Sequence, residues 1–476
     1  MRIARIARSA VVFVALATAA PTLSAQQLAP HQQQLKEIYA QLLEINTSNM
    51  TSGTTEAAQA MAKRFRDAGF PEKDLFIGGV QPNKHNLVVR YHGKGGPNAP
   101  KALILLAHID VVEALKSDWS ADLDPFKFVE RDGYFYARGS TDDKAMAAIF
   151  VANMIRLKQE NYVSDRDIVL ALTADEEGGC CNGVRWLIQN HRELIGDGAF
   201  VINEGGTGAL RDDKPFYNSI QATQKNVVGF TVTASNRGGH SSVPRPDNAI
   251  YQLAEGITRF SKFSFPVHFN EVTTAFFTRT ADVETPEMGR AMKALVKNPN
   301  DAAAAAIVSK DPRYNSMLRT TCVATALKGG HASNALPQTA EMGINCRILP
   351  DAKADEVRDG IVKALADTGL KVSTARANTY VAPSSIGPEI MGPVERVTKE
   401  LYGDIPVIPT MSTGATDSQP FRTIGIPAYG VSGILLDQDD IRAHGRDERM
   451  RAKSLFDGQE FLMRLTKLLS VGTPVP

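Results

Sequence analysis

The sequence contains little cysteine: four residues in 476, with no pair at the CxxC spacing of a structural zinc site. Cys180 and Cys181 are adjacent, and a disulfide between neighbouring residues is strained and uncommon. Cys322 and Cys346 lie in two β-like runs and could pair if these strands are neighbours. The cysteines therefore exclude a cysteine-ligated structural zinc site and leave this one pairing open.

Three further features are missing. No segment beyond the first residues reaches the ~20 apolar residues of a transmembrane helix, so we expect no membrane span. The 53 basic and 52 acidic residues give a net charge of +1, and this lack of a basic field argues against a nucleic-acid partner. No GxSxG elbow follows a strand, which excludes a serine hydrolase of that type.

The first residues have the pattern of an export signal. Arg2, Arg5 and Arg8 are followed by an apolar run and then by small residues up to Ala25. This order predicts a cleavable signal peptide over residues 1–25. We therefore expect a soluble mature protein that is secreted or periplasmic.

Short apolar runs alternate with helix-like stretches in the first half of the chain. The runs cover residues 102–107, 167–174 and 199–203, and the helix-like stretches cover 144–159 and 182–194. This alternation predicts an α/β fold with a mostly parallel sheet between helices. Ligands of such sheets collect beyond the carboxyl ends of the strands.

The pattern changes at Lys225, where half-exposed alternating strands begin. Residues 226–235 and 339–349 alternate in this way, and a helix-like stretch follows at 355–369. They indicate an α+β domain inserted into the first domain. The predicted division is a signal peptide at residues 1–25, an α/β domain in two parts at 26–224 and 384–476, and the inserted α+β domain at 225–383.

Residues that could bind a metal follow the predicted strands. His108 and Asp110 are two apart and face the same way if the strand continues, so the carboxylate could hold the second ring nitrogen. Asp142 opens a helix, where an N-cap is the ordinary explanation. Glu204 follows another strand, and His444 lies in a late loop. Each residue alone has a plain explanation, but their shared position at strand ends favours a metal site.

The stretch LTADEEGGCC places Asp175, Glu176 and Glu177 together where a buried strand ends. Carboxylates this close to an apolar core raise one another's pKa unless a cation compensates. An acidic loop facing water before a helix is the alternative. The other ligand-type residues at the same sheet edge favour the cation.

The ordered motifs, His-x-Asp, ARGSTDDK, DEEGG, NEGG and HGRDER, resemble the two-zinc exopeptidase and amidohydrolase family. Its members include carboxypeptidase S-like peptidases, aminoacylases, acetylornithine deacetylase and succinyl-diaminopimelate desuccinylase. The similarity extends from about Asn46 to Arg449, and SDWSADLDPFKF is most similar to the carboxypeptidase S-like branch. Glu204 stands where some relatives have aspartate, and Asp143 where others have asparagine or methionine.

The resemblance implies two zinc ions per subunit, with cobalt or manganese as substitutes for these oxygen and nitrogen ligands. In this assignment Asp142 bridges the two ions, with His108 and Glu204 on one and Glu177 and His444 on the other. Asp110 would orient His108. Glu176 would be the general base, taking a proton from a water between the metals and later passing it to the leaving amine.

The resemblance also implies that residues 26–224 and 384–476 form the catalytic zinc domain and residues 225–383 a lid and dimerisation domain, and it assigns roles to residues of the lid. His240 would stabilise the oxyanion and reach the partner's site in a homodimer formed through the lid. Asn334 and Arg347 would bind substrate, because an arginine fork suits a carboxylate, although a structural salt bridge is the alternative for Arg347. Three residues of MSTGATDS would border the substrate: Ser412, Gly414 and Thr416.

The predicted function is a secreted two-zinc hydrolase that cleaves an amide next to a free carboxylate. A metallo-carboxypeptidase or dipeptidase is expected, and an N-acyl-amino-acid amidohydrolase is the alternative. A non-catalytic binding protein of the same fold is a more distant alternative, because all five ligands and Glu176 are present. The side-chain specificity stays open, since it depends on the lid.

Overall fold

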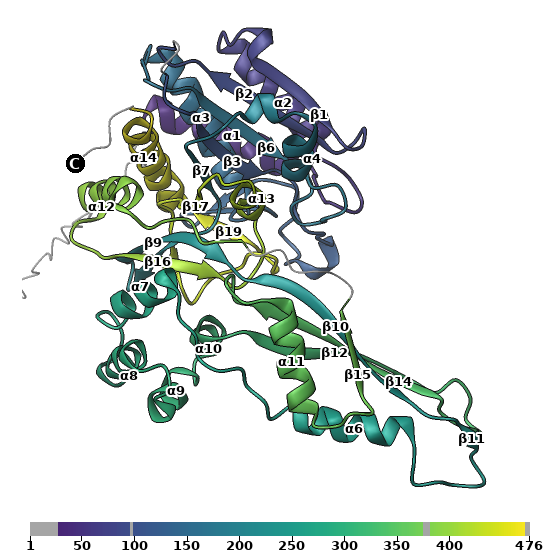
Figure 1. Ribbon diagram of the computed structural model, residues 1–476. Coiled ribbons are helices and arrows are strands. Elements are labelled where there is room, and N and C mark those ends of the chain that lie inside the picture. Colours follow the sequence, from purple (N-terminus) through teal and green to yellow (C-terminus); the bar gives the residue numbers. More distant parts are fainter. Residues whose placement is uncertain (1–26, 96–98, 375–380, 472–476) are drawn as a thin grey trace, which may run out of the picture.

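The computed structural model describes residues 27–95, 99–374 and 381–471 (Figure 1). The predicted signal peptide lies outside the described residues. None of the helices within these ranges is long and apolar enough to cross a membrane.

A ten-stranded mixed sheet forms the centre of the larger domain, with its parallel strands in the middle. The predicted runs form β6, β3 and β7, which are parallel neighbours, and the predicted α/β class is confirmed. β3 and β6 are buried along their whole length, as their unbroken apolar sequence requires. The order is β1 (Leu75–Gly79), β2 (His85–Tyr91), β6 (Ile168–Thr173), β3 (Leu103–His108), β7 (Phe200–Asn203), β17 (Ala428–Gly430), β9 (Lys214–Gln224), β8 (Gly208–Arg211) and β18 (Leu435–Asp437), with β16 (Val407–Ser412) beside β9.

Helices cover both faces of this sheet. Five share one apolar core: α1 (Pro30–Glu44), α2 (Thr55–Asp67), α3 (Lys144–Gln159), α12 (Pro388–Tyr402) and α14 (Ala452–Leu469). Three shorter helices pack on the other face: α4 (Gly183–Asn190), α5 (Arg192–Ile195) and α13 (Ser418–Thr423). α3 is buried on nearly every side, which explains why its sequence is apolar all round.

A smaller sheet, β4 (Val129–Arg131), β5 (Tyr134–Tyr136) and β19 (Arg449–Arg451), has β5 in the middle. The pairing of β19 with β5 places the chain after His444 beside the chain before Asp142. The motifs ARGSTDDK and HGRDER, about three hundred residues apart in the chain, thereby become neighbours.

The segment that the sequence predicts to be a lid, called the lid from here on, forms a separate antiparallel sheet that extends from the larger domain (Figure 1). Its order is β12 (Thr321–Gly329), β14 (Thr339–Ile348), β10 (Asn226–Ser235) and β15 (Lys371–Thr374). Alternating side chains of β10 and β14 are buried beneath α6 (Ala249–Phe260) and α11 (Ala354–Leu365). A short ribbon, β11 (Gly239–His240) with β13 (Ala335–Leu336), forms the tip. The predicted domain boundaries stay predictions.

Four more helices follow α6 in the chain: α7 (Glu271–Thr280), α8 (Pro286–Lys297), α9 (Ala302–Val308) and α10 (Pro312–Leu318); α7 packs against β16, and α8 packs against α7 and α9. They have a core of their own, to which Leu349 and Met411 contribute.

In the lid, Cys322 and Cys346 lie opposite each other on β12 and β14 and form a disulfide, so the condition for their pairing is met. Cys180 and Cys181 are free thiols.

Candidate metal centre

The predicted ligands meet at the carboxyl ends of adjacent parallel strands. His108 is the last residue of β3, and Glu204 follows the last residue of β7 directly. β6 ends at Thr173, and the turn behind it carries Glu176 and Glu177. Because these three strands are parallel neighbours, their side chains reach the same edge of the sheet.

Asp142 lies between two histidines, with a different carboxylate oxygen facing each ring. Its Oδ1 is 3.0 Å from His108 Nε2, and its Oδ2 is 3.2 Å from His444 Nε2. His444 Nε2 also lies 2.7 Å from Glu177 Oε1, and His108 Nε2 lies 3.9 Å from Glu204 Oε2. The five predicted ligands therefore form two neighbouring sets that share Asp142.

The cluster contains more carboxylates than histidines, so its negative charge is not fully compensated. Burial raises the pKa of Glu176 to about 9, with the carboxylates of Glu204 and Asp417 adding to the effect and His108 opposing it. Burial also raises the pKa of Glu204 well above its ordinary value. Hydrogen bonds to Asp142 and Glu177 raise the pKa of His444 to about 10. Oxygen and nitrogen donors that are crowded, partly buried and short of positive charge fit a divalent cation.

Asp110 contacts His108 differently from the sequence expectation. Since β3 ends at His108, Asp110 lies beyond the strand, and its backbone carbonyl oxygen is 3.0 Å from His108 Nδ1. The nearer carboxylate oxygen is 3.6 Å from that nitrogen. The carboxylate instead accepts hydrogen bonds from the backbone N–H groups of Glu176 and Glu177, at 3.1 and 3.0 Å. Asp110 thus holds the histidine with its backbone and the acidic turn with its side chain.

The first carboxylate of the acidic stretch belongs to the scaffold. Asp175 is fully buried, pairs with Lys84 and accepts a hydrogen bond from the backbone N–H of Cys181 at 2.6 Å. Of the three neighbouring carboxylates, only Glu176 and Glu177 face the cluster with His108.

The sequence reasoning missed a buried ion pair behind the ligands. Glu448 accepts hydrogen bonds from Arg138 Nη1 at 2.6 Å, Gly139 N at 3.0 Å, and both N and Oγ1 of Thr141 at 2.7 Å. Arg138 also donates to the backbone carbonyl of Gly445 at 3.1 Å. The pair therefore joins the segment before Asp142 to the loop of His444. The charged residues within ARGST and HGRDER were the available signal.

His240 and Asn334 lie together at the tip of the lid, away from the metal ligands (Figure 1). Ser241 N donates to the Asn334 carbonyl at 3.0 Å, and His240 Nδ1 lies 2.7 Å from Ser242 Oγ. Both predicted residues are exposed. A single chain thus brings them to each other but not to the metal ligands.

Arg347 lies at the other end of the lid, opposite Val227 of β10 and close to the larger domain. Its side chain is half-buried, and it pairs with no carboxylate among the residues that the structure describes. The alternative of a structural salt bridge is therefore not observed. Lys225 lies nearby, and burial lowers its pKa to about 7, with the charges of Arg347 and Arg319 adding to the shift.

The MSTGATDS segment runs from the end of β16 into a loop, and this loop contacts the connection between β9 and β10 that contains Lys225. Thr416 Oγ1 donates to Gln224 Oε1 at 2.8 Å, one residue before Lys225. Gly414 N donates to Ser412 Oγ at 3.0 Å. The loop thus borders the strand that enters the lid.

A parallel sheet whose strand ends gather histidine and carboxylate side chains suits a metal-dependent hydrolase. The family follows from comparison with known proteins: residues 104–468 match the model of peptidase family M20/M25/M40, and the chain belongs to this family. It is accordingly a hydrolase that acts on amide bonds. The resemblance inferred from the motifs is confirmed.

Two curated relatives illustrate the range of the family. The chain is 28% identical over 388 residues to the N-fatty-acyl-amino acid synthase/hydrolase PM20D1 of Xenopus tropicalis, covering 79% of this chain and 71% of the relative. It is 26% identical to a probable carboxypeptidase S-like 2 of Dictyostelium discoideum, with coverage of 80% and 74%.

Solved structures share the fold. An M20 family metallo-carboxypeptidase from Sulfolobus solfataricus has a TM-score of 0.66 at 19% identity, covering 92% of this chain and 99% of that one. A dinuclear metal-binding M20 peptidase from Bacillus subtilis has a TM-score of 0.59 at 12% identity, covering 92% and 98%.

Proposed function

We propose that the protein is a dinuclear zinc hydrolase that cleaves the amide bond next to a free carboxylate, as a metallo-carboxypeptidase or dipeptidase. One observation carries this proposal: the two oxygens of Asp142 face His108 and His444, so one carboxylate is shared by two ligand sets. Glu204 completes one set and Glu177 the other. These donors suit zinc, and cobalt or manganese could substitute.

Glu176 is the proposed general base. Zinc bound at the two sets would acidify a water molecule and polarise the scissile carbonyl. The Glu176 carboxylate takes the proton of the attacking water and passes it to the leaving amine. Its backbone N–H donates to Asp110, which holds the main chain of Glu176 at the edge of the cluster.

Arg347 is the proposed site for the free carboxylate of the substrate. Its guanidinium has no acidic partner among the described residues, and a planar fork binds both oxygens of a carboxylate. A metal site that recognises only a carbonyl and a water cannot select the end of a substrate chain. The Arg347 guanidinium therefore sets the selectivity for a terminal carboxylate.

The proposed active form is a homodimer through the lid, with a second copy of this chain as the partner. His240, proposed to stabilise the oxyanion, lies far from the ligands of its own chain, as does Asn334. β12 is an edge strand with Val323 and Leu327 58% and 65% exposed, and Tyr251 on α6 is 62% exposed. Exposed apolar edge strands are templates for pairing.

Export is proposed from the sequence pattern of the first 25 residues. The disulfide between Cys322 and Cys346 supports this proposal, since disulfides persist in oxidising compartments.

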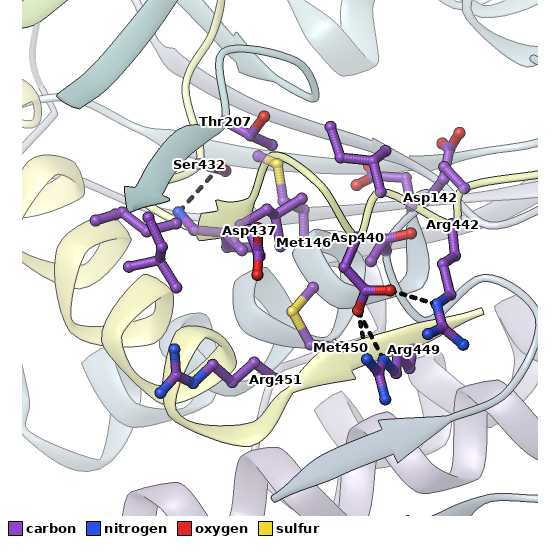
Figure 2. A pocket seen from close by; sticks show the side chains of 18 of the residues that line it. Asp142, Met146, Thr207, Ser432, Asp437, Asp440, Arg442, Arg449, Met450 and Arg451 are labelled. Carbon is purple, nitrogen blue, oxygen red and sulfur yellow. Dashed lines mark hydrogen bonds and ion pairs between the residues drawn. The ribbon is translucent and has the colours of Figure 1, made fainter. Parts of the chain in front are cut away.

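An N-acyl-amino-acid amidohydrolase is the second candidate, and one observation favours it. A cavity with both apolar and charged side chains in its wall begins at Asp142 and Glu204, beside the proposed reaction centre, and Met146, Leu210 and Met450 are among its apolar residues (Figure 2). The named activity of the Xenopus tropicalis relative is of this type.

A screen of dipeptides and N-acyl amino acids, with metal analysis of the purified protein, tests both candidates. We expect two divalent ions per chain, loss of hydrolysis on chelation and recovery with zinc or cobalt. A preparation that binds no divalent metal, or that hydrolyses these substrates equally well in excess chelator, would overturn the proposal.

A further inference from the structure

Two free thiols lie in the loop between β6 and α4, shortly after the acidic turn of the metal centre. Cys180 is exposed, and Cys181 is buried. Adjacent cysteines form a disulfide only with strain, whereas Cys322 and Cys346 are oxidised in the lid. The proposed function uses neither free thiol. The pair is therefore a dithiol whose role the metal centre does not explain.

A carboxylate adds a third donor to this pair. One oxygen of Asp175 and the Sγ atoms of Cys180 and Cys181 all lie within 4.8 Å of one another. The ligand atoms of one tetrahedral ion, with bonds of about 2.0–2.3 Å, lie roughly 3.3–3.8 Å apart. Small rotations of the two cysteine side chains therefore suffice to bring three donors onto one ion.

The surrounding contacts hold these donors in place. Asp175 accepts the backbone N–H of Cys181 at 2.6 Å and pairs with Lys84, which also donates to the Asn49 carbonyl at 2.5 Å. Gln81 Nε2 donates to Cys181 Sγ at 3.2 Å. A donor of this kind favours a thiolate over a thiol, and such outer contacts orient metal ligands. Each carboxylate oxygen has two lone pairs, so Asp175 can keep its partners and still bind an ion.

The charge of the group suits a cation. Because Lys84 balances Asp175, two deprotonated thiols would leave two uncompensated negative charges. A hydrogen bond with the Cys181 side chain, with the Asp175 carboxylate adding to the effect, raises the pKa of the Cys180 thiol to about 12. This thiol is therefore protonated when no ion is bound, and a bound ion must displace its proton.

We propose that Asp175, Cys180 and Cys181 form a binding site for a soft, thiophilic divalent cation such as cadmium. Thiolates select soft ions, whereas the oxygen and nitrogen donors of the metal centre suit harder ones. The exposed Cys180 leaves one side of the site open, and three protein ligands leave a fourth position for water. The site therefore binds an exchangeable ion, and it does not depend on the proposed function.

Cadmium titration of the zinc-loaded full chain, with the Cys322–Cys346 disulfide intact, tests this site. Sulfur-to-cadmium charge transfer gives an ultraviolet absorption band, and cadmium at the metal centre cannot give it, because the ligands there are oxygen and nitrogen. A single equivalent of cadmium should saturate the band. Binding should strengthen as the pH rises, because thiol protons are displaced, and magnesium should not compete. A titration without a saturable sulfur band overturns the proposal.

Three variants examine the individual contacts. Cys180→Ser and Cys181→Ser should each lower the affinity for cadmium by about tenfold or more, because one of two sulfur ligands is lost. Gln81→Leu should lower it about tenfold, because Cys181 Sγ loses its donor. Gln159→Leu is the matched control for Gln81→Leu, since Gln159 is also exposed and lies at the end of α3. Its affinity for cadmium should be unchanged.

Alkylation of Cys180 by iodoacetamide separates a chelating pair from a single reactive thiol. A single equivalent of cadmium should slow this reaction about tenfold or more in the unchanged protein, but much less in Cys181→Ser. Equal protection in both, or equal cadmium affinity in both, would show that Cys180 binds alone and would overturn the chelate site. None of these readouts requires hydrolysis, so they stay valid if the proposed function fails.

Discussion

The Glu448 carboxylate and the Arg138 guanidinium form a buried ion pair, 2.6 Å between Oε2 and Nη1, that joins the segment before Asp142 to the loop of His444. Glu448 also receives the backbone N–H groups of Gly139 and Thr141, which precede Asp142. Removing the charge of Glu448 should therefore loosen the ligands rather than remove one.

Glu448→Gln should lower zinc affinity about 10- to 100-fold, the usual effect of losing a group that positions a ligand. The measurement is competition with a chelating dye, alongside the unfolding temperature of the metal-free protein. Glu400→Gln is the matched control, because Glu400 forms exposed ion pairs on α12. Lower metal-free stability with unchanged zinc affinity would show that the pair supports only the fold.

The neighbouring glutamates Glu176 and Glu177 should separate chemistry from metal binding. Glu176→Gln should keep both metals and lose about 100-fold or more in kcat, because it removes the proton shuttle. Glu177→Gln should weaken one metal, since Glu177 faces His444 at 2.7 Å. Metal content and single-turnover rates distinguish the two variants. Equal metal loss in both would show that the roles within the pair are assigned wrongly.

Arg347→Ala should raise KM about tenfold or more for substrates with a free carboxylate, because a charge-assisted hydrogen bond is lost. The same substrates as carboxamides should be nearly unaffected, and they serve as the control. Steady-state kinetics on both series gives the answer. An equal rise in KM for the carboxamides would mean that Arg347 shapes the lid without recognising the carboxylate.

Sequence patterns predict those candidate site residues whose position is marked by the residues next to them in the chain. His108 and Glu204 end unbroken apolar runs, and the fold follows from the alternation of those runs with helices. The sequence did not indicate a role for Glu448, because its partner Arg138 lies 310 positions away in the chain. The pairing of β5 with β19 brings the two residues together. The sequence also did not predict that the Asp110 carboxylate binds the backbone of the acidic turn, because this contact depends on where β3 ends. Tertiary contacts, which local patterns do not encode, decide such roles.

Lys225 should make stability depend on pH. Burial lowers its folded pKa to about 7, below the ordinary 10.5, so the unfolded chain binds more protons between these values. Stability should therefore rise with pH through this window, by up to about 1 kcal/mol per pH unit. Lys225→Met should show a flatter profile between pH 7 and 10 when unfolding is followed in denaturant. A profile identical to that of the unchanged protein would contradict the assignment.

The position of His240 predicts complementation between two inactive proteins. His240→Ala should lower kcat more than it raises KM, because the oxyanion is stabilised mainly in the transition state. If His240 acts in the partner's site, a hybrid dimer of His240→Ala and Glu176→Gln chains contains one site with both intact groups. Mixing the two should therefore restore hydrolysis, whereas mixing Glu176→Gln with Arg347→Ala, Glu176→Gln should not. Subunit exchange is verified by mass spectrometry of labelled chains. Confirmed exchange without any recovered activity would place His240 outside the partner's site.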